Sequence, residues 1–160
     1  MSETKKLNFI VKLTGSGLFT GYFPVASGTV ASFAAICMYA FIPGFTNLYF
    51  FIPLILVTIA AGIYTGNKFE EVYGKDPSEC TIDEFAGQWI SLIGVPVQPE
   101  LLAINFIIWR VLDIIKPYPA NRLEKLDGGK GIMADDIMSG VYTLVIMQIL
   151  LNFFIKIVEK

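Results

Sequence analysis

The chain has 160 residues and contains no histidine. This absence excludes phosphohistidine chemistry, a serine–histidine catalytic triad and zinc sites built on imidazole ligands. The two cysteines, Cys37 in an apolar segment and Cys80 in a polar one, do not predict a disulfide framework. Neither cysteine is followed at the sixth position by arginine, and no D-x-D-x-T sequence occurs. Two common nucleophile motifs of phosphoryl transfer are therefore also missing.

Charged residues are scarce, at 16%, whereas 54% of the residues are apolar, a balance typical of membrane proteins. Between Lys12 and Lys68 there is no charged residue, and this gap of 55 positions could hold two membrane crossings of about 20 residues each. The net charge of −2, with no basic segment, argues against nucleic acid as a partner. The length predicts one domain, spanning residues 1–160.

The charge-poor stretches predict the order of the helices. They cover residues 28–42, 46–66, 85–109 and 137–155. The third stretch is interrupted by a Gly- and Pro-rich cluster at 94–99, which is a turn signal and predicts two helices, at about 81–93 and 100–116. The sequence therefore predicts an all-α, integral membrane bundle of about five membrane-embedded helices, as two hairpins plus a C-terminal helix. Residues 4–13 are expected to form either a short interfacial helix or a frayed tail.

The basic residues predict which side of the membrane the polar loops face. In this topology ten of the twelve Lys and Arg residues lie on one side, and only Lys156 and Lys160 lie on the other. Because cytoplasmic loops carry an excess of positive charge, the polar loops are predicted to face the cytoplasm. The ten are Lys5, Lys6, Lys12, Lys68, Lys75, Arg110, Lys116, Arg122, Lys125 and Lys130.

Two pairs of adjacent carboxylates stand beside apolar runs. Asp83 and Glu84 precede one run, where Thr81 and Glu84 could instead form a capping box. Asp135 and Asp136 precede the last run, where they could be ordinary first-turn acids that complement the helix dipole. Carboxylate oxygens are also the ligands that hard divalent cations prefer. The pairs therefore indicate a candidate divalent-cation site.

The glycine-rich segment 128–131 favours this functional interpretation of the last pair. It ends four positions before Asp135, and glycine permits close backbone approach to a ligand.

Arg110, Asp113 and Lys116 are spaced by three and share one helical face, which Pro117 then ends. They could form a plain salt-bridged ladder, with Lys116 complementing the helix C-terminus. Ionisable groups at a membrane edge are costly, however, and indicate function. Arg110 and Lys116 would suit a phosphate group, and Asp113 would hold a metal or orient Arg110.

Gly28 and Thr29 open the first long apolar helix, after Ser27. A helix N-terminus of this kind could bind an anion through its backbone N–H groups and the Thr29 hydroxyl. It could also be a plain N-cap.

With these motifs in place, the chain closely resembles the phosphatidylglycerophosphatase A family over nearly its whole length. The matching segments are Pro24 to Ala35, Ile82 to Trp89, Trp109 to Pro119 and Gly128 to Gly140. Ser27, Ala31, Tyr118 and Ser139 differ from the residues usual in the family, but none of these differences removes a charged group.

The resemblance implies a Mg²⁺-dependent enzyme that hydrolyses phosphatidylglycerol phosphate to phosphatidylglycerol in the bacterial inner membrane, with its site facing the cytoplasm. Its partners would be the phospholipid substrate and the membrane, with the oligomeric state open. The residues expected to bind Mg²⁺ are Asp83, Glu84, Asp135 and Asp136. The same four carboxylates and Asp113 are the expected catalytic residues. The residues expected to bind the phosphate group are Gly28, Thr29, Arg110 and Lys116.

Two other functions compete with a lipid phosphatase. A phosphatidyl transferase would also use clustered Asp residues, but its D-G-x2-A-R signature is absent, since Asp127-Gly128 is followed by Gly-Lys-Gly. A small ion or proton transporter would have acids spread through the depth of the membrane, whereas here only Glu100 departs from the polar side.

Overall fold

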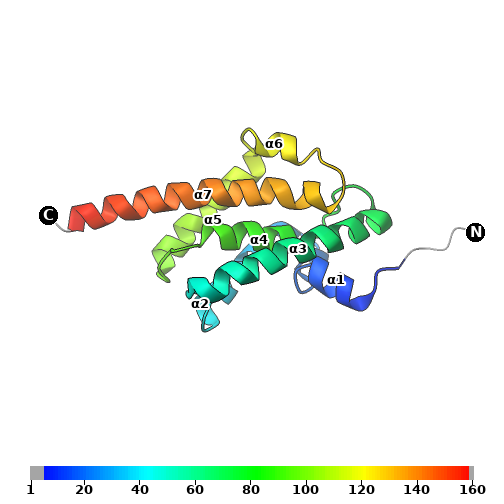
Figure 1. Ribbon diagram of the computed structural model, residues 1–160, viewed down its shortest axis with the longest axis horizontal. Coiled ribbons are helices and arrows are strands. Elements are labelled where there is room, and N and C mark those ends of the chain that lie inside the picture. Colours follow the sequence, from blue (N-terminus) through cyan, green and yellow to red (C-terminus); the bar gives the residue numbers. More distant parts are fainter. Residues whose placement is uncertain (1–5, 159–160) are drawn as a thin grey trace, which may run out of the picture.

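The computed structural model describes residues 6–158, with side chains described as far as residue 153. Within these residues all of the regular secondary structure is helical (Figure 1). The prediction of an all-α fold is confirmed. The elements in chain order are α1 (Phe9–Gly15), the 3₁₀ turn η1 (Thr20–Tyr22), α2 (Ser27–Phe41), α3 (Leu48–Tyr73), α4 (Ile82–Ser91), α5 (Pro99–Ile115), α6 (Ala120–Leu123) and α7 (Gly129–Val158).

The first helix begins later than the sequence predicts. Asn8 caps it by accepting a hydrogen bond from the Ile10 N–H (3.1 Å), so α1 starts at Phe9 and runs to Gly15. Residues 4 and 5 of the expected 4–13 helix lie outside the described residues.

The first predicted hairpin is present, with Pro43-Gly44 in the turn between α2 and α3. The chain reverses here, so that the rings of Tyr39 and Phe51 lie 5.2 Å apart. α3 continues beyond the apolar run to Tyr73 and ends at Gly74, whose φ of 95° is readily adopted by glycine.

The second predicted hairpin is also present, because the chain turns between Ser91 and Pro99. Proline at the start of α5 suits the first helical position, where no N–H is needed. Contacts between Glu84 and Arg110 at one end, and between Ser91 and Asn105 at the other, show that α4 and α5 are antiparallel.

A buried polar cluster ties the far ends of α4 and α5 together. The Gln88 side-chain amide donates to Asn105 Oδ1 (2.7 Å) and to Ser91 Oγ (2.9 Å), while the Asn105 amide donates to the Ser91 carbonyl (2.8 Å). All three side chains are fully buried. Such pairing compensates for removing these groups from water and fixes the register of the two helices.

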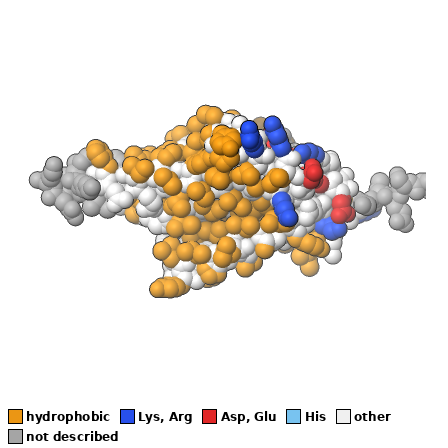
Figure 2. Space-filling view, turned by 45° about the horizontal axis from the view of Figure 1, so that its top comes forward, with side chains coloured by type: hydrophobic (Ala, Val, Ile, Leu, Met, Phe, Trp, Pro, Cys, Tyr) orange, Lys and Arg blue, Asp and Glu red, His pale blue; other side chains and the backbone are white. Residues whose placement is uncertain are grey.

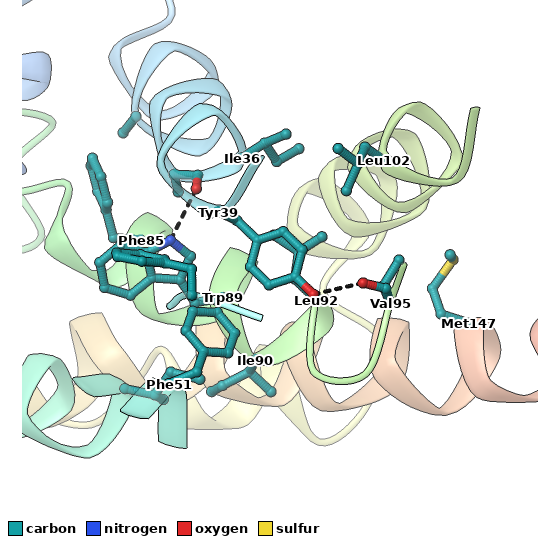
Figure 3. Packing of buried hydrophobic residues seen from close by; sticks show 14 residues of the cluster. Ile36, Tyr39, Phe51, Phe85, Trp89, Ile90, Leu92, Val95, Leu102 and Met147 are labelled. Atoms are coloured by element: carbon teal, nitrogen blue, oxygen red, sulfur yellow. Dashed lines mark hydrogen bonds between the residues drawn. The ribbon is translucent and has the colours of Figure 1, made fainter. Parts of the chain in front are cut away.

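α4 is the central helix of the bundle, and nine of its ten residues are buried. It packs against α2, α3, α5 and α7. Trp89 anchors it, making edge contacts with the rings of Phe85 (5.6 Å) and Phe45 (5.5 Å) and donating its indole N–H to the Ala35 carbonyl (3.0 Å; Figure 3).

α7 begins at Gly129, so the expectation that Asp135 and Asp136 open this helix is wrong, and they lie in its second turn. The backbone N–H of Gly129 donates to Asn67 Oδ1 (2.8 Å), and Gly129 packs against the backbone of Ile63. Gly128 and Gly129 therefore serve close packing against α3, whereas Gly131 packs against the backbone of Leu126.

Two helices in the described part of the chain, α3 and the stretch Gly129–Phe153 of α7, are long and apolar enough to cross a membrane. α2, α4 and α5 are shorter. The surface in Figure 2 is largely hydrophobic, with the charged side chains gathered towards one end of the molecule.

Candidate functional site

A cavity of about 610 Å³ lies where the start of α2, the start of α4, the end of α5 and the second turn of α7 meet. Every site residue predicted from the sequence lines it. These residues are Gly28, Thr29, Asp83, Glu84, Arg110, Asp113, Lys116, Asp135 and Asp136. Four separate helices thus bring the four sequence motifs to one place.

Arg110 joins α5 to α4 on one wall of the cavity. Its Nη1 atom lies 2.6 Å from Glu84 Oε2 and 3.0 Å from Asp113 Oδ2. The Ser32 hydroxyl of α2 donates to the same Glu84 oxygen at 2.8 Å. Asp113 therefore orients the guanidinium, as one of the two roles predicted for it requires, and Glu84 is held in place from two sides.

The capping-box interpretation of Thr81 and Glu84 is wrong. Thr81 stands at the N-cap of α4 but makes no side-chain cap hydrogen bond. Its hydroxyl lies 3.1 Å from that of Thr20 instead, while the Glu84 carboxylate is engaged by Ser32 and Arg110.

Lys116 leaves the helical face that it was expected to share with Arg110. α5 ends at Ile115, and Lys116 adopts a left-handed conformation (φ 47°). Its amino group then lies 2.6 Å from Asp135 Oδ2 and 2.9 Å from Glu124 Oε2. Burial lowers the pKa of Lys116, but the hydrogen bonds to Asp135 and Glu124 outweigh this effect and hold that pKa above its usual value. Lys116 is therefore a fixed cation.

Gly28 makes room for Glu84. A Cβ atom at position 28 would overlap Glu84 Oε1 and lie 3.7 Å from Arg110 Nη1. The plain N-cap interpretation of Ser27 is wrong, because Ser27 is already helical and its hydroxyl donates to the Ser78 carbonyl (2.9 Å).

Acidic side chains outnumber basic ones around the cavity, with six carboxylates against Arg110 and Lys116. Three buried carboxylate oxygens have no hydrogen-bond partner among the described residues: Asp83 Oδ1, Asp135 Oδ1 and Asp136 Oδ2. Unpaired buried carboxylates are costly, so the site has an unmet capacity for cations. An all-oxygen donor set suits Mg²⁺, Ca²⁺ or Mn²⁺.

The carboxylates are not preassembled as a metal site. Within residues 6–158, no group of three or more acidic or cysteine side chains is close enough to hold an ion. Glu84 and Asp135 are instead engaged by Arg110 and Lys116. The chemistry of the residues fits a divalent cation, but binding one would require these side chains to change partners.

Sequence reasoning missed two groups on the cavity wall. Asp76, in the loop after α3, is exposed and left-handed (φ 46°). The only signal for it was an isolated Asp-Pro pair near the Asp83 motif. Cys80 also lines the cavity, but burial and the nearby Asp83 raise the pKa of its thiol, which disfavours a nucleophilic thiolate.

Comparison with known proteins gives a consistent picture. A family model described as Phosphatidylglycerophosphatase A matches residues 13–151. A Bacteroides thetaiotaomicron protein that carries the provisional name of phosphatidylinositol-3-phosphatase is 34% identical over 152 residues, covering 91% of this chain and 96% of that protein. The phosphatidylglycerophosphatase A of Escherichia coli K12 is 33% identical over 132 residues, covering 81% of this chain and 76% of that protein. The phosphatidylglycerophosphatase A of Haemophilus influenzae is 27% identical over 148 residues, covering 89% of this chain and 91% of that protein. No solved structure matches the chain significantly.

Proposed function

Because the chain belongs to the phosphatidylglycerophosphatase A family and is thus a phosphoric monoester hydrolase, we propose that it hydrolyses phosphatidylglycerol phosphate to phosphatidylglycerol and inorganic phosphate, with Mg²⁺ as cofactor. The observation that carries this proposal is the meeting of two fixed cations and five predicted carboxylates on one cavity.

Arg110 and Lys116 bind the terminal phosphate in this proposal. Each is held by carboxylates, Arg110 by Glu84 and Asp113, and Lys116 by Asp135 and Glu124. These contacts hold the two cations at the cavity wall, where a phosphate group can replace Glu84 and Asp135 as their partner. Thr29 and the backbone around Gly28, at the start of α2, complete the phosphate site.

Asp83, Glu84, Asp135 and Asp136 would hold Mg²⁺. When bound, Mg²⁺ supplies charge stabilisation at the phosphoryl oxygens and a water of lowered pKa as nucleophile. The phosphate takes over the hydrogen bonds of Arg110 and Lys116, which releases Glu84 and Asp135 from their present partners. Asp83 and Asp136 already present unpaired oxygens.

The cavity faces the cytoplasm of a bacterial inner membrane that the chain crosses several times, with about five embedded helices. Supporting this placement, Asp76 of the α3–α4 loop lines the cavity, and Glu124, between α6 and α7, pairs with Lys116 beside it. Both loops thus lie at the charged end of the molecule. The acids of the cavity also lie at this end. An ion transporter would have acids spread through the depth of the membrane, so their position favours a phosphatase.

A second candidate substrate is phosphatidylinositol 3-phosphate, favoured by the printed name of the 34% identical relative. Both lipids present a phosphate monoester on a headgroup, so the same cavity could take either. The test is phosphate release by the purified protein in detergent from each lipid, with Mg²⁺ and with EDTA. Faster Mg²⁺-dependent release from phosphatidylglycerol phosphate supports the proposal, preference for the phosphoinositide selects the alternative, and release from neither contradicts both.

A further inference from the structure

A second hollow, of about 300 Å³, runs along the seam between α2 and α5, and its lining is apolar. Ile36 and Leu102, each 8% exposed, lie next to one another in it (Figure 3). Phe33 and Ile107, each 60% exposed, form its rim. We call this hollow the α2–α5 groove.

The α2–α5 groove continues the seam that forms the polar cavity. Ser32 Oγ and Arg110 Nη1 face one another across this seam at 3.5 Å. The ring of Phe33, the next residue of α2, meets edge to face the ring of Phe106, one turn from Arg110 on α5, with 6.4 Å between the ring centroids. Going from the cavity to the groove, α2 runs forward from Gly28 and α5 runs backward from Arg110, so the two helices are antiparallel. A ligand with a phosphate at Arg110 would therefore have apolar surface directly below it.

We infer that the α2–α5 groove binds one acyl chain of the phospholipid substrate. This inference rests on the proposed function and deepens it. A phospholipid monoester needs a polar site for its headgroup and an adjacent apolar surface for its tail, and the two hollows supply both in that order.

The length of the groove agrees with an acyl chain. From Arg110 to Pro99, at the far end of the groove, α5 rises about 16 Å at ~1.5 Å per residue. The groove itself, from Ile107 to Pro99, accounts for about 12 Å of this rise. One leaflet contributes about half of the ~30 Å hydrocarbon core of a bilayer, so the groove covers most of the depth that one acyl chain occupies.

Ala103 offers a direct way to block the groove, because it is a small exposed residue in its lining. Ala103→Trp fills the space with an indole ring. A matched control is Ala60→Trp, which makes the same change at an exposed position on α3 outside the groove.

The kinetic test compares long-chain phosphatidylglycerol phosphate with a dihexanoyl analogue. Ala103→Trp should lower kcat/KM for the long-chain lipid about tenfold or more, since loss of apolar contacts weakens binding, and should change it less than about twofold for the short-chain analogue. Ala60→Trp should change neither value by more than about twofold. An equal effect of Ala103→Trp on both substrates, or no effect on either, would overturn the groove assignment.

A binding test keeps the inference independent of turnover. Phosphatidylglycerol phosphate carrying a diazirine on its acyl chain is photo-cross-linked in EDTA to the purified protein in nanodiscs, with phosphatidylcholine bearing the same chain as the comparison. We expect cross-links in residues 33–36 and 99–107 to be enriched for phosphatidylglycerol phosphate and to be lost in Ala103→Trp. Equal labelling by both lipids would mean that only bulk lipid fills the groove and would refute the inference. Selective labelling without hydrolysis of phosphatidylglycerol phosphate would instead preserve the groove and refute the proposed function.

Discussion

Gly28 on α2 packs directly against the carboxylate of Glu84 on α4, leaving no room for a Cβ atom at position 28. The same carboxylate accepts hydrogen bonds from Ser32 (2.8 Å) and Arg110 (2.6 Å). The absence of a side chain at Gly28 therefore sets the position of a site carboxylate and, through it, of a site cation.

Gly28→Ala should displace Glu84 and Arg110 and lower kcat about a hundredfold, since small misplacements of positioning groups are costly. It should also lower the free energy of unfolding by about 1–3 kcal/mol through overpacking. The control is the same change in a Glu84→Ala background, where the methyl group has space and thermal denaturation in detergent should show little further loss. An equal loss in both backgrounds would place the effect in α2 itself.

Lys116 is the residue at which structural and functional interpretations differ most. If Lys116 is a phosphate ligand, Lys116→Ala should lower turnover about a hundredfold or more. Lys116→Arg should also lower turnover, because a planar guanidinium group places its donors differently from an ammonium group. The exposed Lys125→Ala is the control and should stay within about twofold of the parent. Near-parental turnover of Lys116→Ala at saturating substrate and Mg²⁺ would leave Lys116 with a structural role.

The pH dependence of stability provides a further readout for Lys116. Because its pKa is raised, its ion pairs contribute fully below the ordinary lysine pKa of about 10.4, and the contribution is lost only as pH rises through the higher folded value. Thermal denaturation in detergent should therefore show a loss of stability above about pH 10 in the parent that is absent in Lys116→Ala, and the same loss in both proteins would contradict this role of the ion pairs.

Asp83 and Asp136 are buried and each has an unpaired oxygen. Asp83→Asn or Asp136→Asn should lower Mg²⁺-dependent turnover about a hundredfold or more, because the amide keeps the shape but loses the charge that a hard cation needs. In EDTA, both variants should be at least as stable as the parent, since an uncompensated buried carboxylate has been removed. Only the parent should gain thermal stability when Mg²⁺ is added, and a similar gain in both variants would contradict the metal assignment.

Asp76 lines the cavity from an exposed, left-handed position. Asp76→Asn retains a residue that tolerates this conformation while removing the charge. We expect the Mg²⁺ concentration for half-maximal activity to rise about tenfold, as for residues that support a metal from outside its ligand shell. Asp127→Asn, an exposed acid that does not line the cavity, should leave that concentration unchanged. A matching response of the two variants would assign Asp76 no special role.

The topology can be tested with single cysteines in a background that lacks Cys37 and Cys80. Cysteines at Lys75 and Lys125 should resist an impermeant thiol reagent on intact cells and react after permeabilisation, because both loops are proposed to face the cytoplasm. A cysteine at Gln98, in the turn at the opposite end of α4 and α5, should react on intact cells. Different labelling of Lys75 and Lys125 would exclude the arrangement of two hairpins.

The sequence predicted α2, α4 and α5 to within a few residues because charges, prolines and glycines mark their ends. It did not predict the start of α7, because the capping groups for Gly128 and Gly129 come from Glu70 and Asn67, about sixty positions earlier. A local pattern cannot reveal such distant partners.

The candidate site was also predicted only in part. Motif chemistry predicted which charged residues meet, since carboxylates and cations at helix ends are costly unless they share a site. The spacing also predicted that Asp113 could orient Arg110. It did not predict the contact of Lys116 with Asp135, which depends on a left-handed residue, or the role of Gly28, which depends on how closely α2 approaches α4.

Polar interactions join α4 and α5 at both ends of their hairpin. At one end these are the hydrogen bonds among Gln88, Ser91 and Asn105, and at the other end it is the ion pair of Glu84 with Arg110. If α4 moved along α5 by one turn, the hydrogen bonds and the ion pair would break together, and amide groups would be left unpaired in an apolar interior. If α3 and α7 cross the membrane as proposed, they could adjust to a change in bilayer thickness by tilting, whereas sliding of α4 along α5 is opposed. The distance between Glu84 on α4 and Arg110 on α5 would thus stay the same when the bilayer around the protein changes, whereas Asp135 and Asp136 would move with α7.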